Sequence, residues 1–195
     1  MVYGQYSYEF LSTFKRYYIR SPFQYCFRDD FISHLLYVIN RKENVPAYSS
    51  VKDIYFENTH YFTGYKELMK KKGIPCCFNA FVFEQFEFEI KAIGYKETVA
   101  GSKATALFYF MNDSFFMGEY IFKKPVTDIK SSLAEHFLER KDIKADNFYI
   151  ENSSNRIIHY QDTGFSVDIK YLCLEDQHII SNLQGYFQLI TGKNP

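Results

Sequence analysis

The stretch KATALFYFMNDSFFMGEYIF, residues 103–122, decides the fold class of this 195-residue chain. It contains two aromatic-rich runs, Lys103 to Met111 and Phe115 to Phe122, joined by the turn-forming cluster Asn112-Asp113-Ser114. So short a turn joins antiparallel strands, because a parallel pair requires a long crossover connection. Bulky apolar groups occupy both faces of each run. The stretch therefore predicts two central antiparallel strands with both faces covered.

Four more strands are expected outside this pair. Residues 86–91 alternate apolar and charged side chains, which is typical of a half-buried strand, although a helical stripe fits the same stretch. Three shorter runs, separated by turn-forming residues, follow at Phe148 to Glu151, Arg156 to Tyr160 and Phe165 to Leu172. The pattern predicts a mostly antiparallel sheet of about six strands.

Helical periodicity predicts three helices that pack on this sheet. They are expected from Thr63 to Lys72, from Thr127 or Asp128 to the charged residues 139–141, and from Glu175 to Ile190. Thr63 is a natural N-cap for the first helix, and Gly73 ends it. We expect these helices to cover one face of the sheet and N-terminal helices to cover the rest.

The first 60 residues are expected to be mainly helical. Apolar residues recur at helical spacing over residues 6–18, and a second helix is expected over residues 29–39, where an aspartate can cap its start. Residues 41–50 are polar and contain a proline, so we expect a loop, followed by a short strand at residues 54–56. The sequence thus predicts a single α+β domain over residues 1–195, with a helical segment 1–60 and the sheet in 61–195.

Composition restricts the classes of function. The formal net charge is +0, whereas a general nucleic-acid binder needs a basic face to neutralise phosphates. The basic run Lys70 to Lys72 lies at the end of an expected helix, where cations interact favourably with the helix dipole. No signal-peptide pattern and no long apolar run occurs in the sequence. We therefore expect a cytoplasmic location, reduced cysteine thiols and no membrane partner.

No cofactor and no metal ion is expected. The chain has neither a Gly-x-Gly-x-x-Gly nor a Gly-Lys-Ser/Thr phosphate loop. The four cysteines, Cys26, Cys76, Cys77 and Cys173, include no Cys-x-x-Cys pair. Structural zinc sites normally contain such closely spaced ligands, so His34 together with these cysteines does not predict a zinc site.

Three residues are candidates for acid–base chemistry. Glu119 is a carboxylate within an otherwise apolar strand, and buried acids of this kind cluster at functional sites. His159 and Asp168 lie on successive expected strands, and a histidine held by a carboxylate can act as a general base. The simpler interpretation of His159 and Asp168 is a cross-strand polar pair on a solvent-exposed face of the sheet.

The acids Glu84, Glu87 and Glu89 resemble the paired carboxylates that glycoside hydrolysis uses. Glu87 and Glu89 would share one face of the strand expected at residues 86–91. Alternating charged residues are also what a solvent-exposed strand face requires. We therefore interpret these acids as a solvated face.

The aromatic content, 18 Tyr and 21 Phe, has two interpretations. Exposed tyrosines supply rigid amphipathic area for a partner, whereas a bias towards AT-rich codons would account for the same excess without any function. We expect a non-catalytic protein that binds another protein, of the immunity, inhibitor or adaptor type, through Tyr6, Tyr17 and Tyr18.

The alternative is a small-ligand-binding protein or an enzyme with a pocket between the sheet and the helices. Stacking of single-stranded nucleic acid on aromatic side chains is disfavoured, because the chain lacks the basic groove that such binding requires. The layout of helices and antiparallel strands resembles that of small bacterial binding, immunity or inhibitor proteins. That resemblance is one of architecture alone.

Overall fold

The computed structural model describes residues 39, 45–83, 87–122, 126, 128–139 and 143–191. Within these ranges the chain forms one eight-stranded sheet and three helices. Apart from Ile39, which is helical, the two helices expected over residues 6–18 and 29–39 lie outside the described residues.

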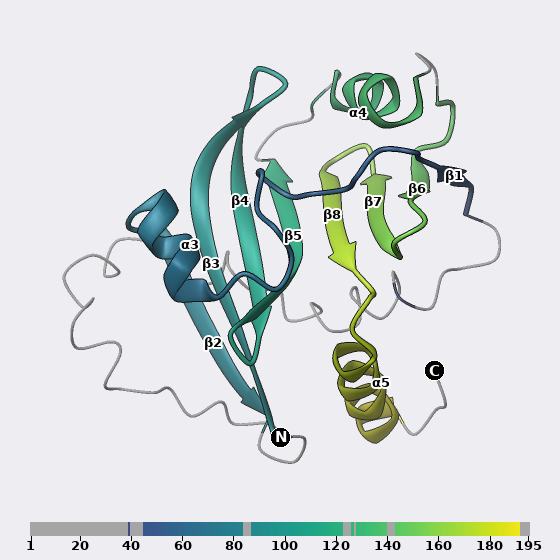
Figure 1. Cartoon of the computed structure of the whole chain (residues 1–195). Helices are drawn as coiled ribbons and strands as arrows, with labels where there is room; N and C mark the ends of the chain where they lie inside the picture. Colours follow the sequence, from purple (N-terminus) through teal and green to yellow (C-terminus); the bar gives the residue numbers. More distant parts are fainter. Residues whose placement is uncertain are drawn as a thin grey trace.

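The sheet is mostly antiparallel (Figure 1). Its strands are β1 (Ala47–Ser49), β2 (Cys77–Phe83), β3 (Phe88–Val99), β4 (Ser102–Met111), β5 (Ser114–Phe122), β6 (Asn147–Glu151), β7 (Arg156–Asp162) and β8 (Val167–Cys173). Their order in the sheet is β1-β6-β7-β8-β5-β4-β3-β2. Two meanders, β2 to β5 and β6 to β8, therefore meet where β5 pairs with β8. The expected α+β class with a mostly antiparallel sheet is confirmed.

The expected number of about six strands is too low. The strand β1 lies where a loop was expected, and it pairs in parallel with β6, Ala47 opposite Tyr149. The strand β2 was not expected either. The three residues of β1 are too few to show an alternating pattern, and its pairing with β6, about 100 residues further along the chain, leaves no local pattern. The short strand expected at residues 54–56 is absent, and Phe56 forms only an isolated bridge with Thr59.

Three helices pack on the sheet within the described residues: α3 (Tyr65–Lys72), α4 (Ile129–Leu138) and α5 (Gln177–Thr191). Gly64 rather than the expected Thr63 is the N-cap of α3, and Gly73, with a φ of 84°, ends that helix as expected. Among the helices that the structure describes, none combines the length and the apolar character that a membrane span requires.

The helices cover both faces of the sheet, whereas a single face was expected. Leu133 of α4 and Leu68 of α3 belong to one core cluster, together with Tyr171 of β8. Ile179 of α5 belongs to the other cluster, together with Leu172 of β8. We call these two sides the α4 face and the α5 face. Side chains alternate along each strand, so neighbours in sequence face opposite sides.

The segment between β1 and α3 crosses the α4 face of the sheet, as the dark blue trace in Figure 1 shows. Its residue Phe56 is fully buried, with its ring centroid 4.8 Å from that of Phe108, 4.7 Å from that of Tyr120 and 5.3 Å from that of Tyr171. Gly118 makes room for it, because a Cβ atom at this position would lie 2.2 Å from the Phe56 ring. Many of the aromatic residues in the described ranges thus fill the core.

The cysteines differ in chemical state. Cys77 is disulfide-bonded, so the expectation of four reduced thiols is wrong at this position. Disulfide partners are set by distance in the folded chain, which sequence spacing does not reveal. Cys76 and Cys173 are free.

Alkylation with iodoacetamide at neutral pH is expected to modify Cys76 and to spare Cys173 in the folded protein. Cys76 is partly exposed, whereas Cys173 is 1% exposed and burial raises the pKa of its thiol to about 11. Since the thiolate is the nucleophile, Cys173 stays protonated and unreactive at pH 7. Peptide mapping by mass spectrometry measures both rates, with urea-unfolded protein as the control. Equal rates for the two thiols in the folded protein would contradict this assignment.

Candidate functional site

The three residues expected to carry acid–base chemistry lie on the α5 face of the sheet. Glu119, His159 and Asp168 are 4%, 1% and 4% exposed. The solvent-exposed face expected for His159 and Asp168 is therefore wrong, because both faces of these central strands are covered. His159 is opposite Lys170, and Asp168 is opposite Gln161, so the expected pairing of His159 with Asp168 is displaced by two residues.

Glu119 belongs to a buried charge pair. Its Oε1 lies 3.3 Å from the Nζ of Lys170, which is directly opposite on β8. The hydroxyl of Tyr109 donates a 2.7 Å hydrogen bond to its Oε2. On β7, the next strand along this row, the Nε2 of His159 lies 2.8 Å from the Oδ1 of Asn147. These contacts satisfy the buried charge of Glu119 and make the pair a structural element of the α5 face.

The other expected site residues do not assemble into a site. Glu87 lies in a turn with a φ of 52°, outside the strand that Glu89 occupies, so the two acids do not share a strand face as expected. Glu89 pairs with Lys91 at 2.9 Å. The remaining expected residues, Tyr6, Tyr17, Tyr18, Cys26, His34 and Glu84, lie outside the described residues. Within the ranges that the structure covers, no group of three or more His, Cys, Asp or Glu side chains is placed to hold a metal ion.

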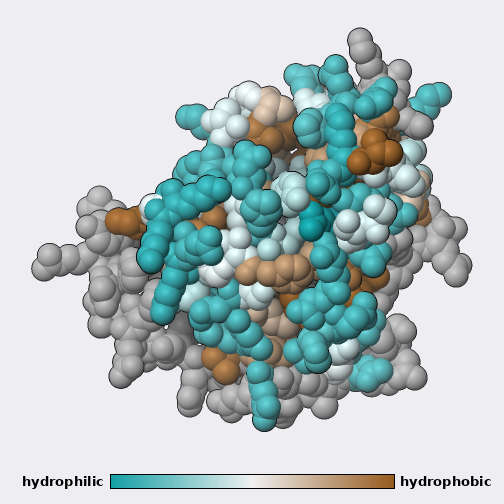
Figure 2. All heavy atoms as spheres, in the orientation of Figure 1, coloured by the Kyte–Doolittle hydropathy of each residue, from teal (hydrophilic) through white to brown (hydrophobic). Residues whose placement is uncertain are grey.

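A groove of about 720 Å³ lies on the opposite, α4 face. Its floor is formed by Tyr120 of β5 and by Ile169 and Tyr171 of β8. Its walls come from α4, from the segment 52–58 and from the tip of the β3–β4 hairpin, through Ile129, Ser132, Leu133, Glu135, His136, Phe137, Lys52, Tyr55, Glu57, Asn58, Val99 and Ala100. In Figure 2, which keeps the orientation of Figure 1, apolar side chains show between the hydrophilic ones that cover most of this side.

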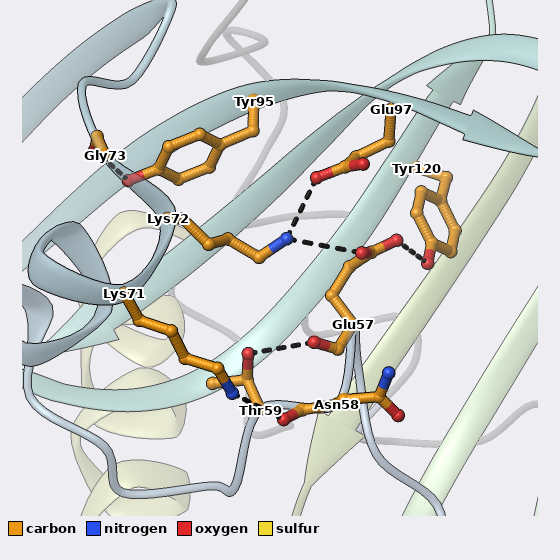
Figure 3. Close-up of polar contacts among 9 residues, drawn as sticks. All are labelled: Glu57, Asn58, Thr59, Lys71, Lys72, Gly73, Tyr95, Glu97 and Tyr120. Atoms are coloured by element: carbon orange, nitrogen blue, oxygen red, sulfur yellow. Dashed lines mark hydrogen bonds and ion pairs between the residues drawn. The ribbon is translucent and has the colours of Figure 1, made fainter.

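Glu57 is the centre of a polar cluster at the groove (Figure 3). The hydroxyl of Tyr120 donates a 2.5 Å hydrogen bond to its Oε1. The Nζ of Lys72 lies 3.3 Å from its Oε2 and 2.9 Å from the Oε1 of Glu97. Lys72 also lies over the Phe108 ring, 5.5 Å from its centroid. The cluster therefore ties the crossing segment to the end of α3 and to two strands of the sheet.

The backbone at Glu57 adopts an uncommon conformation. Both Glu57 and Asn58 have a φ of 52°, in the left-handed region that asparagine tolerates better than glutamate does. The segment is held there by a bond from the Thr59 hydroxyl to the Glu57 carbonyl and by a bond from Lys71 to the Asn58 carbonyl. Residues held in such conformations are concentrated at ligand-binding and active sites.

Tyr171 contributes a polar group to the groove floor. The residue is 7% exposed, and its hydroxyl has no hydrogen-bond partner among the residues that the structure describes. Burial, and then the negative charge of Glu57, raise the pKa of Tyr171 well above its ordinary value. Burial is also the main reason that the pKa of Tyr120 is raised. Both hydroxyls therefore remain protonated at neutral pH.

The rim of the groove carries charges of both signs. The Nζ of Lys52 donates a hydrogen bond to the backbone carbonyl of His136 and makes no ion pair among the described residues. Glu135 and the His136 side chain are exposed on the last turns of α4. A bound molecule would therefore meet the Glu57 carboxylate at the wall, a tyrosine hydroxyl at the floor and a mixed set of charges at the rim.

The sequence reasoning missed Glu57 and Tyr171. The segment 52–58 has no regular period, and the left-handed turn occurs at a glutamate, so no sequence signal indicated its position. Tyr171 lies in a run whose alternation was readable, but alternation does not tell which strands become neighbours. Neither a family model, nor a curated protein, nor a solved structure was found to match this chain.

Proposed function

We propose that the protein binds a small organic molecule in the groove on the α4 face. The single observation that carries this proposal is the groove of about 720 Å³, which brings together the Glu57 carboxylate in its wall and, on its floor, the Tyr171 hydroxyl, which has no hydrogen-bond partner among the described residues. Ligand sites in proteins have volumes of about 300–1,000 Å³ and combine apolar walls with a few convergent polar groups. The α4 side chains Ile129 and Leu133 supply such a wall.

The proposal is for binding rather than for catalysis. Both oxygens of Glu57 already accept a contact, one from Tyr120 and one from Lys72. A carboxylate held in this way is fixed in position, which favours recognition of a ligand. The three residues expected to carry acid–base chemistry, Glu119, His159 and Asp168, face the opposite side of the sheet.

Protein binding through Tyr6, Tyr17 and Tyr18 stays a second prediction. These tyrosines lie outside the described residues, so it rests on the sequence alone. Their substitution by alanine should weaken binding of a protein partner and leave folding unchanged.

Tryptophan at Ser132 is expected to abolish binding of small molecules to the groove. Ser132 is exposed and lines the groove, so an indole there occupies its volume without disturbing the core. The assay is saturation-transfer NMR with a library of fragments that each contain one aromatic ring and one polar group. The wild type is expected to give hits that are lost in Ser132→Trp.

The matched control is Ser131→Trp. Ser131 is the adjacent exposed serine of α4 and does not line the groove, so hits should be retained in this variant. A wild-type protein without hits, or hits that survive in Ser132→Trp, would refute groove binding.

A further inference from the structure

We propose that the ligand of this groove carries an ammonium group, and that this group binds between the carboxylate of Glu57 and the hydroxyl oxygen of Tyr171. The inference rests on the proposed groove function and specifies the chemical class of the ligand.

The charges of the polar cluster support an ammonium ligand. Glu57 and Glu97 both contact the Nζ of Lys72, at 3.3 Å and 2.9 Å, so two carboxylates share one ammonium group. These contacts leave one negative charge uncompensated within the cluster. The neighbouring Lys71 does not compensate this charge. Its Nζ contacts the backbone carbonyl of Asn58, it makes no ion pair among the described residues, and it does not line the groove. Glu57 therefore brings a negative charge to the wall of the groove, next to its floor.

Tyr171 is an independent indication of a ligand at the same place. It is more than nine-tenths buried, it lines the groove, and its hydroxyl has no partner among the described residues. The hydroxyl oxygen is not among the fully buried polar atoms that lack a partner, so it is open to the groove and can accept a hydrogen bond from a bound molecule. Glu57 and Tyr171 both line the groove and both contact Tyr120, whose hydroxyl donates to the Glu57 carboxylate and whose ring centroid lies 5.8 Å from that of Tyr171. A group that donates to both side chains would give the Tyr171 hydroxyl a partner and would bind across the wall and the floor.

An ammonium group matches this site better than an alcohol or an acid does. It has three donors and no acceptor, and the Glu57 carboxylate and the Tyr171 oxygen both accept. A hydrogen bond between two charged partners is shorter and stronger than a neutral one. A carboxylate ligand would be repelled by Glu57, and it would find its cation, Lys52, only at the rim. The apolar side chains Ile129, Leu133 and Ile169 would then contact the body of the ligand.

Three probes with the same ring and different head groups test the inference: benzylammonium, benzyl alcohol and benzoate. Each is titrated into the full chain with detection by ¹H–¹⁵N correlation NMR, which also reports whether a variant is folded. Benzylammonium is expected to bind roughly tenfold more tightly than benzyl alcohol, as a charge-assisted hydrogen bond predicts. Glu57→Gln is expected to abolish this preference. Tyr171→Phe is expected to weaken benzylammonium binding by roughly threefold to tenfold.

Glu135→Gln is the matched control, because Glu135 is a second carboxylate of the same groove and lies at the exposed rim. The preference for benzylammonium should survive this change. If Glu57→Gln does not fold, Tyr171→Phe and Glu135→Gln still show whether the ammonium group binds next to Tyr171 at the floor or next to Glu135 at the rim. Equal binding of the three probes, a preference for benzoate, or loss of the preference in Glu135→Gln would overturn the inference. If the fragment library still gives hits that Ser132→Trp removes, the groove function stands without it.

Discussion

Replacing Phe56 by alanine is expected to lower the free energy of unfolding by about 3–5 kcal/mol. The side chain is fully buried where the crossing segment meets the sheet, and the rings of Phe108, Tyr120 and Tyr171 surround it. These neighbours belong to strands and cannot move in to fill the space, so a cavity remains. Urea denaturation followed by circular dichroism measures the loss.

Phe62→Ala is the matched control, because Phe62 lies in the same segment and is 43% exposed. Its substitution should change the free energy of unfolding by less than about 0.5 kcal/mol. A cost for Phe56→Ala that is no larger than this would show that the segment does not anchor on the sheet.

A double-mutant cycle with Gly118→Ala tests the same contact from the other side. Alone, Gly118→Ala is expected to cost about 1–3 kcal/mol, because its Cβ atom would lie 2.2 Å from the Phe56 ring. In the Phe56→Ala background the ring is gone, so the added methyl group should be tolerated. The two costs should therefore be non-additive. Additive costs would mean that the lack of a side chain at Gly118 is not what makes room for the Phe56 ring.

The second large effect is expected at the buried charge pair of the α5 face. Lys170→Met should lower the free energy of unfolding by about 3–5 kcal/mol, because it leaves the Glu119 carboxylate buried without its cation. Glu119→Leu should have a similar cost, because it leaves Lys170 buried alone. The double variant Glu119→Leu/Lys170→Met should be close to wild type, since packed apolar side chains can replace a buried ion pair.

The control for this set is Lys91→Met, which removes the ion pairs of Lys91 with Glu89 and with Asp113. These three side chains are more exposed than the buried pair, at 18%, 28% and 51%. Its cost should stay below about 1 kcal/mol. All variants are compared at one pH and one ionic strength by urea denaturation. If the double variant costs as much as the two single variants together, the pair is not the reason for their effects.

The strands with a clear period of two could be predicted from the sequence. The two runs within residues 103–122 form β4 and β5 with the expected turn, and residues 88–91 of the run expected at 86–91 belong to the strand β3 and not to a helix. The alternation of Val167, Ile169 and Tyr171 with Asp168 and Lys170 is also found in β8. That alternation predicted that Asp168 and Lys170 lie on a solvent-exposed face, because polar residues normally face solvent. All of β8 is buried instead.

The candidate site could not be predicted to the same extent, because it depends on which strands become neighbours. The position of Glu119 in an apolar strand indicated a buried acid, and the carboxylate is buried. Its cation Lys170 was not found, since β5 and β8 are far apart in the sequence and pair only through the sheet order. The groove combines a segment without periodicity with a floor from β5 and β8. Local patterns contain no information on such a combination.

The sheet order also has a consequence for the way the finished protein is made. A ribosome releases the N-terminal part of a chain first. The wall residues 52–58 therefore emerge long before Ile169 and Tyr171, which form the floor, and before β6, on which β1 docks. During synthesis this wall has no complete floor to pack on. The groove exists only once β8 has been added beside β5, so a ligand has its binding site only after the ribosome has released the residues of β8.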